Sequence, residues 1–210
     1  MSLMVSSPKD NFVLVPEGTH LARCYRIVDM GTQKTTYMGK EKAVRKVQIT
    51  WEIHGEDADG KKIAMSDGRP LVISRKFTPS LSPKAALRAF LVSWRGKQFT
   101  EEELNGFALP NILDKWCLLT VTHEIREDKT YANVASVSGV PSSIRSMGLP
   151  EAVNECVQFD LDDPNWDVFE TLGDFIRGQI MESPEYRMIR NVDVEEEATY
   201  SKMKKEDIPF

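Results

Sequence analysis

Long hydrophobic runs are missing from this sequence. No stretch approaches the ~20 apolar residues that a membrane-spanning helix requires. The opening residues, MSLMVSSPKDN, lack the charged start and apolar segment of a secretion signal. Hydrophobic residues still make up 41% of the chain, which is enough for a folded core. We therefore expect a cytoplasmic protein without a membrane partner.

Cysteine and histidine are scarce, with three residues of each type. The cysteines lie far apart and form no CxxC pair: Cys24, Cys117 and Cys156. The histidines are equally dispersed, and none has a Cys or His neighbour at ligand spacing: His20, His54 and His123. These spacings favour free thiols and argue against a disulfide framework or a zinc site. We predict neither a metal nor a cofactor.

The motifs of common catalytic and nucleotide-binding sites are missing as well. The sequence contains no Walker A loop, no GxGxxG after a strand, no GxSxG and no HExxH. No nucleophile lies beside a base in the sequence, so nothing supports catalysis. We predict a binding protein rather than an enzyme.

Charge is divided unequally along the chain. Residues 1–140 hold 20 Lys and Arg against 16 Asp and Glu, a net charge of +4. Residues 141–210 hold 7 against 16, a net charge of −9. Such asymmetry suggests a front part that tolerates polyanions and a rear part that repels or imitates them.

Patterns typical of strands dominate the front part. Five are predicted, at residues 18–30, 44–53, 69–77, 116–125 and 130–138. In the second, Val47, Ile49 and Trp51 alternate with polar residues. The last two strands are joined by the polar turn REDK, which predicts a hairpin.

Two helices are predicted between the third and fourth strands. The first begins with Ser82 as N-cap and Pro83 at the first helical position, and it ends at Gly96. Its buried face is formed by Leu87, Phe90, Leu91 and Trp94. The second is short, with a capping box of Thr100 and Glu103.

This order of elements predicts the fold class. Five strands with a helix between the third and fourth is the order of an OB-fold, a small partly open barrel that binds oligonucleotides. We therefore expect a mainly β fold with added helices, with an OB-fold-like five-stranded barrel over residues 1–140. Other small barrels and α+β sheets share this order and stay open as alternatives.

The rear part is predicted to add a helical segment and a tail. Residues 141–192 begin with a linker or extended strap, and an amphipathic helix follows from Asp163 and Pro164. We expect its apolar stripe to pack on the core: Val168, Phe169, Leu172, Phe175, Ile176 and Ile180. Residues 193–210 are polar and short of aliphatics, which predicts a disordered acidic tail.

A basic segment, predicted as a loop, follows the first strand at residues 31–46. It holds five cations around one aromatic ring: Lys34, Tyr37, Lys40, Lys42, Arg45 and Lys46. The third strand adds Arg75, Lys76 and Phe77. Single-stranded nucleic acid is bound by such a combination, since cations hold phosphates while rings stack on bases. A plain solvated loop is the alternative, because Lys-rich loops are common.

The chain as given ends in KKEDIPF at residues 204–210. Its last five residues, EDIPF at 206–210, resemble the C-terminal tip of bacterial single-stranded-DNA-binding proteins, in which an OB domain binds DNA and the tip docks onto replication and repair proteins. The resemblance implies that Phe210 fills a partner's pocket while its carboxylate meets a basic residue. It implies partner-binding roles for Glu206, Asp207, Ile208, Pro209 and Phe210.

The front part resembles a second family. VPEGTHLARCYRIVDMGTQ, RKVQITWEI and SLSPKAALRAFLVSWRGKQFTEEEL, together with CLLTVTHE and KTYANVASVS, are similar to proteins of tailed phages and prophages that are associated with replication. Members of that family are thought to be phage-encoded single-stranded-DNA-binding proteins. The resemblance implies work inside a bacterial host cell.

Three functional hypotheses follow. The first is a protein that coats single-stranded DNA in phage replication or recombination and recruits replication or repair proteins through its tail. The second is an OB-fold adaptor of the same replication module that binds protein without binding DNA. The third is an enzyme whose site is assembled from dispersed carboxylates. A homo-oligomer is compatible with the first two.

Overall fold

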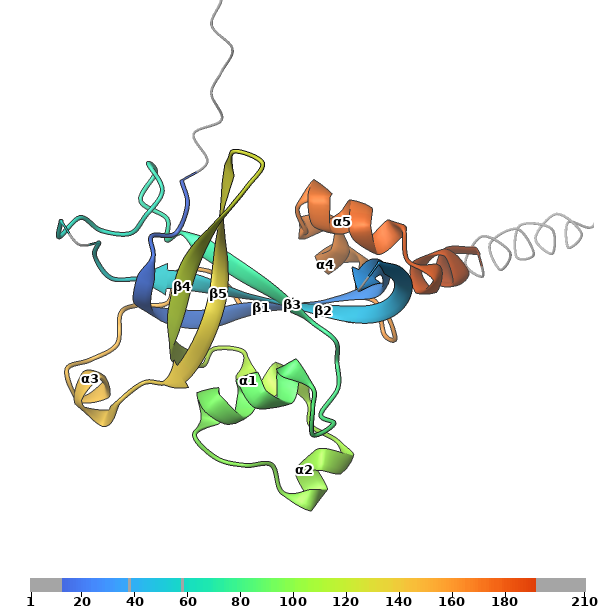
Figure 1. The fold of residues 1–210 in the computed structure, drawn as a ribbon, viewed down its shortest axis with the longest axis horizontal. Coiled ribbons are helices and arrows are strands. Elements are labelled where there is room, and N and C mark those ends of the chain that lie inside the picture. The colour runs from blue at the N-terminus through green and yellow to red at the C-terminus, as the bar shows by residue number, and fades with distance from the viewer. Residues whose placement is uncertain (1–12, 38, 58, 192–210) are drawn as a thin grey trace, which may run out of the picture.

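The computed structural model describes residues 13–191, apart from residues 38 and 58. Its described part is mainly β, built on one six-stranded sheet with several helices (Figure 1). The strands are β1 Gly18–Tyr37, β2 Lys40–His54, β3 Val72–Phe77, β4 Trp116–Arg126, β5 Lys129–Gly139 and β6 Val157–Phe159. The predicted class is therefore confirmed at this level.

Strand order follows from how the strands pair. The sheet runs β3-β2-β1-β4-β5 with antiparallel neighbours, and the short β6 pairs parallel to β1. The expected hairpin of β4 and β5 is confirmed, with a tight turn at Glu127 and Asp128. The ladder does not close, because β3 and β5 remain its two edges. A closed barrel is therefore not confirmed.

The basic segment predicted as a loop is mostly strand, and that expectation was wrong. β1 continues through Gly31 to Tyr37, and β2 returns from Lys40, so the two form one long hairpin. Two bulges bend β1, between Cys24 and Arg26 and between Asp29 and Thr32. Threonines in this stretch favour extended backbone, and each strand satisfies the other's backbone groups.

The main core lies between one face of the sheet and α1, Ala86–Arg95. Trp51 of β2 is completely buried, with its ring centroid 5.7 Å from that of Phe90 and 6.0 Å from that of Trp94. Burial of a large apolar side chain contributes roughly 1.5–3 kcal/mol. The predicted helical face, Leu87, Phe90, Leu91 and Trp94, is buried as expected.

The start of α1 differs from the prediction. Residue 85, not Ser82, precedes the first helical residue, and Ala85 N donates to Ser82 O at 2.9 Å. Pro83 therefore lies inside a turn, where its fixed φ is also favoured. The predicted end at Gly96 is confirmed, with φ of 68°. The short helix α2, Glu101–Asn105, has the predicted capping box, and a 3₁₀ turn, η1 Leu109–Ile112, follows.

The C-terminal part crosses the other face of the sheet. A short helix, α3 Ser142–Ser146, leads into an extended segment, and β6 follows. The single predicted helix is in fact two, α4 Trp166–Thr171 and α5 Asp174–Met181, because Leu172 and Gly173 are extended. The first is capped by Asn165 rather than Asp163. Residues 184–191 are helical as well.

A second apolar cluster fixes these helices to the sheet. It joins Val28 and Met30 of β1 to Phe159, Leu161, Phe169, Leu172, Ile176 and Ile180. The expected packing of the apolar stripe is thus confirmed for most of its members. Phe175 is the exception, since 74% of it is exposed. Within the described residues, no helix is long and apolar enough to span a membrane.

Candidate nucleic-acid interface

The far end of the β1–β2 hairpin presents lysines on both of its faces. Lys34, Lys40 and Lys42 are exposed. Both bulges insert their extra residue in β1, so side chains of β2 alternate regularly and Lys40, Lys42 and Lys46 share one face. Lys34 pairs with Ala43 and lies on the other face.

Lys46 and Lys76 bring two positive charges together on neighbouring strands. Lys46 Nζ donates to Thr78 Oγ1 at 3.1 Å, and Lys76 Nζ donates to Gln179 Oε1 of α5 at 2.5 Å. The pKa of Lys76 is lowered, first by its partial burial and second by the nearby charge of Lys46. An anion beside this pair would relieve the repulsion between the ammonium groups.

A groove of about 920 Å³ opens near Lys76, whose ammonium group lies close to the groove residue Phe175. We call it the β3–β5 groove, and its lining comes from β3, β5, α5 and the segment before β1: Val13, Leu14, Val15, Val72, Ile73, Ser74, Lys129, Thr130, Tyr131, Ala132 and Phe175. Figure 1 shows the β4–β5 hairpin and α5 rising on either side of β3. The groove therefore lies between the two edge strands of the sheet.

Two exposed aromatic rings line the β3–β5 groove. Tyr131 is 46% exposed and Phe175 is 74% exposed. The Lys76 ammonium lies 5.9 Å from the centroid of the Phe175 ring, so one cation borders the groove at this end. Lys129 supplies another and has no side-chain partner among the described residues. Glu124 lies opposite Tyr131, but Arg126 balances its charge through contacts of 2.8 and 2.6 Å.

Three residues predicted to bind nucleic acid are committed to the fold. Arg45 is paired with Asp29 and, at 2.8 Å, with Asp162, and the hydrogen bond to Asp29 is the main reason for its raised pKa. Arg75 donates to Val134 O at 3.0 Å, and burial lowers its pKa. Phe77 is 3% exposed and offers no face to a base. We therefore remove these three from the candidate surface.

Arg75 instead links the two edges of the sheet. It reaches from β3 to the β5 backbone, and its guanidinium lies 4.9 Å from the centroid of Phe77 and 5.5 Å from that of Phe90. Its charge thus stabilises the approach of β3 and β5 rather than an external ligand.

Other predicted residues lie outside the described part of the chain. They are the side chain of Tyr37 and the five tail residues Glu206, Asp207, Ile208, Pro209 and Phe210. The tail therefore stays a prediction.

A buried polar cluster on β1 and β2 was not expected from the sequence. Glu52 is completely buried and accepts hydrogen bonds from Arg23 at 3.0 Å and from Asn154 Nδ2 at 2.6 Å. The backbone N–H groups of Val153 and Asn154 donate to it at 3.2 and 2.8 Å. The segment around residue 154 is thus fixed over Glu52, and this end of the polar face of β2 is not open to a ligand.

Sequence reasoning missed three residues of the groove, Lys129, Tyr131 and Phe175. The sequence pattern predicts Phe175 in a buried helical stripe, but the break at Leu172 and Gly173 separates α4 from α5 and Phe175 is 74% exposed. No cluster of three or more His, Cys, Asp or Glu that could hold a metal occurs among the described residues. The resemblance to phage replication proteins also stays a prediction, because searches of protein-family models and of curated proteins find no match to this chain.

Proposed function

We propose that the protein binds single-stranded DNA along the basic face of the β1–β2 hairpin and through the β3–β5 groove. One observation carries the proposal: Tyr131 and Phe175 expose their rings in one groove beside Lys129 and Lys76. Stacking of a base on such a ring contributes about 1–3 kcal/mol whatever the base, while the cations hold phosphates. This chemistry suits coating of a strand.

We also propose that the sheet is an OB-type barrel. Its support is the strand order β3-β2-β1-β4-β5, the position of α1 between β3 and β4, and the Arg75 contact between the edge strands. OB-folds bind oligonucleotides on their central strands and the adjoining loops. Here α5 and the extended segment around Asn154 cover part of β1 and β2. The groove at β3 and β5 and the far end of the β1–β2 hairpin stay open.

In this proposal the protein coats single strands during phage replication or recombination in a bacterial host. The tail residues 206–210 recruit replication or repair proteins by an aromatic anchor and acidic contacts. The support for this part is the resemblance of residues 206–210 and of most of residues 10–140 to the two families named above.

The first experiment measures binding of labelled dT oligonucleotides by fluorescence anisotropy at several salt concentrations. The affinity should fall steeply as salt rises, because each neutralised phosphate releases counterions. Duplex DNA and RNA of equal length are measured beside it. Absent binding, or an affinity that ignores salt, contradicts the proposal.

The groove is tested with the double variant Tyr131→Ala/Phe175→Ala. Both side chains are substantially exposed, so the fold should tolerate their loss, and the affinity for dT should fall at least tenfold. Met188→Ala is the control, because it removes another exposed apolar side chain, 68% exposed, on the helix at 184–191. Equal dT affinities of the double variant and of Met188→Ala would exclude the β3–β5 groove as a DNA-binding site.

The adaptor is the second candidate. Val72 and Phe175 expose apolar surface at an edge strand, where a peptide could add to the sheet. This function predicts partner binding through the same groove without any oligonucleotide shift.

A further inference from the structure

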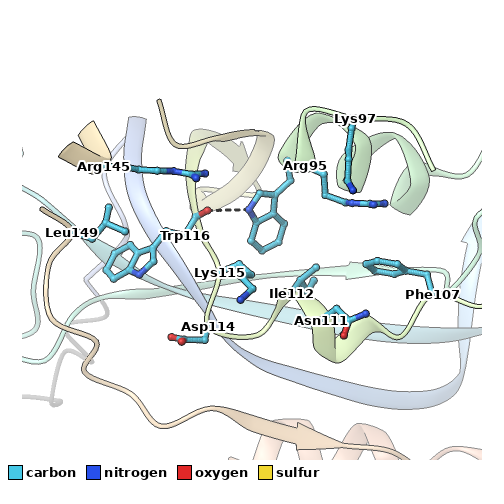
Figure 2. Close-up of a pocket in the computed structure, with 11 residues that line it drawn as sticks. Arg95, Lys97, Phe107, Asn111, Ile112, Asp114, Lys115, Trp116, Arg145 and Leu149 are labelled. Carbon is cyan, nitrogen blue, oxygen red and sulfur yellow. Dashed lines mark hydrogen bonds between the residues drawn. The ribbon is translucent and has the colours of Figure 1, made fainter. Parts of the chain in front are cut away.

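A second pocket, of about 460 Å³, lies at the opposite end of β4 from the hairpin turn. Figure 2 shows its lining, which comes from α1, η1, the start of β4 and the α3 region. We call it the Trp116 pocket: Trp94, Arg95, Lys97, Phe107, Asn111, Ile112, Asp114, Lys115, Trp116, Arg145 and Leu149. Its volume is within the ~300–1,000 Å³ of small-ligand sites.

The indole of Trp116 forms one wall of this pocket. One side of the ring is covered by His54, with centroids 4.9 Å apart, and the ring also lines the pocket. Arg145 and Leu149 lie beside it in Figure 2. The backbone of Trp116 is held as well, because Trp94 Nε1 donates to Trp116 O at 3.1 Å. A flat ligand could therefore stack there on a preformed surface.

Positive charge surrounds that ring. The lining holds four cations, Arg95, Lys97, Lys115 and Arg145, against one carboxylate, Asp114. Arg95 is paired with Glu103, whereas the side chains of Lys115 and Arg145 have no partner among the described residues. Asp114 is paired with Arg23 at 2.9 Å, so its negative charge is matched.

A neutral path joins this pocket to the β3–β5 groove. Trp116, Thr120 and Glu124 alternate onto the outer face of β4, and Glu124 lies opposite Tyr131. The residues between the two rings on this face are mostly small and polar: Thr120, Thr122, Asn133, Ser136 and Ser138. Eight residues of strand cover about 27 Å. No unpaired carboxylate among the described residues of this face would repel a phosphate chain.

We infer that the Trp116 pocket binds a nucleotide unit, with its base on the indole and its phosphate between Lys115 and Arg145. The inference rests on the proposed function, since it makes this pocket a second contact for the same single strand. An acidic peptide fits less well, because it carries no base whose edge could pair with Asp114 and Asn111.

The test uses the full chain, dT oligonucleotides of about 6 and about 20 nucleotides, and free thymidine monophosphate. The variant is Lys115→Glu/Arg145→Glu. It should leave the affinity for the short oligonucleotide unchanged and lower that for the long one about tenfold. Lys61→Glu/Lys62→Glu is the control, because it changes two exposed lysines and the net charge equally.

The outcomes separate this inference from the proposed function. If the wild type binds both oligonucleotides and the variant matches it at both lengths, the pocket is excluded while strand binding stands. Free thymidine monophosphate should quench the tryptophan fluorescence of the wild type, and the variant should abolish this quenching. That result supports nucleotide binding in the Trp116 pocket. Binding of the peptide KKEDIPF there, with no nucleotide effect, overturns the inference. A wild type that binds no single strand overturns both.

Discussion

At the scale of single residues, Glu52 connects the sheet to the segment that crosses it. Its carboxylate accepts hydrogen bonds from Arg23 on β1, His54 on β2 and Asn154 on the segment between α3 and β6. Removing the Glu52 carboxylate leaves Arg23 with only Asp114 as a carboxylate partner among the described residues, and breaking such a buried pair costs about 3–5 kcal/mol. Glu52 thus fixes which face of the sheet stays covered.

Glu52→Gln should therefore destabilise the protein by about 3 kcal/mol. The amide keeps the shape of the side chain but leaves Arg23 facing a neutral group, half of which is a donor. Urea unfolding followed by tryptophan fluorescence measures the loss. Glu155→Gln is the control, because that carboxylate is exposed on the same segment, and a similar loss for both variants would contradict the role of Glu52.

The same carboxylate predicts a dependence of stability on pH. Burial acts to raise the pKa of Glu52, but the hydrogen bonds from Asn154, His54 and Val153 outweigh it, so the pKa lies below its ordinary value of 4.5. Its contribution is therefore present above about pH 4.5 and is lost as the pH falls through the folded-state pKa. Unfolding free energies between neutral pH and pH 3 should fall less steeply for Glu52→Gln. Parallel curves would refute this.

At the scale of elements, the turn of the β4–β5 hairpin has unfavourable chemistry. Glu127 and Asp128 both have positive φ, 47° and 63°, which two-residue hairpin turns usually assign to Asn and Gly. Glu127→Asn/Asp128→Gly should stabilise the protein by roughly 1 kcal/mol. Thermal unfolding measures the gain. Glu127→Gln changes only charge and should have little effect; an equal gain from it would point to electrostatics instead.

The elements also show how far the sequence predicts this fold. Alternation of Val47, Ile49 and Trp51 predicts β2 correctly, because half of a strand packs on a core. The far end of the β1–β2 hairpin contains few apolar residues, so its lysines and threonines predict a loop instead of two strands. The burial of Glu52 depends on Asn154, about a hundred residues later, and local patterning cannot reveal it.

The candidate site was predictable only in part for the same reason. Lys40, Lys42 and Lys46 belong to one basic segment and fall on one strand face. The sequence predicts Arg75 and Phe77 as nucleic-acid-binding residues too. In the structure Arg75 contacts the β5 backbone and Phe77 is buried, because β3 lies close to β5. The same arrangement of β3 and β5 forms the groove that Tyr131 and Phe175 line. Its lining residues come from strands and a helix that lie far apart in the sequence.

At the scale of the whole molecule, the division of charge predicts separate roles for the folded part and the tail. Residues 1–140 have a net charge of +4, whereas the tail, residues 193–210, holds 6 Asp and Glu against 3 Lys, a net charge of −3. We therefore expect the tail to compete with DNA for the same cations. Deleting residues 206–210 should leave the affinity for dT unchanged or raise it severalfold at low salt, and the difference should vanish at high salt.

The same deletion should abolish capture of replication or repair proteins from a bacterial extract, because the anchor Phe210 and the acidic residues Glu206 and Asp207 are gone. A variant with the last five residues in scrambled order keeps their charge and is the matched control. The scrambled variant should have the same DNA affinity as the full chain, because repulsion between the tail and DNA depends only on charge. It should still fail to capture partners, because a partner's pocket needs the aromatic side chain at its position. Loss of DNA binding in the deletion would show that the tail belongs to the binding surface itself.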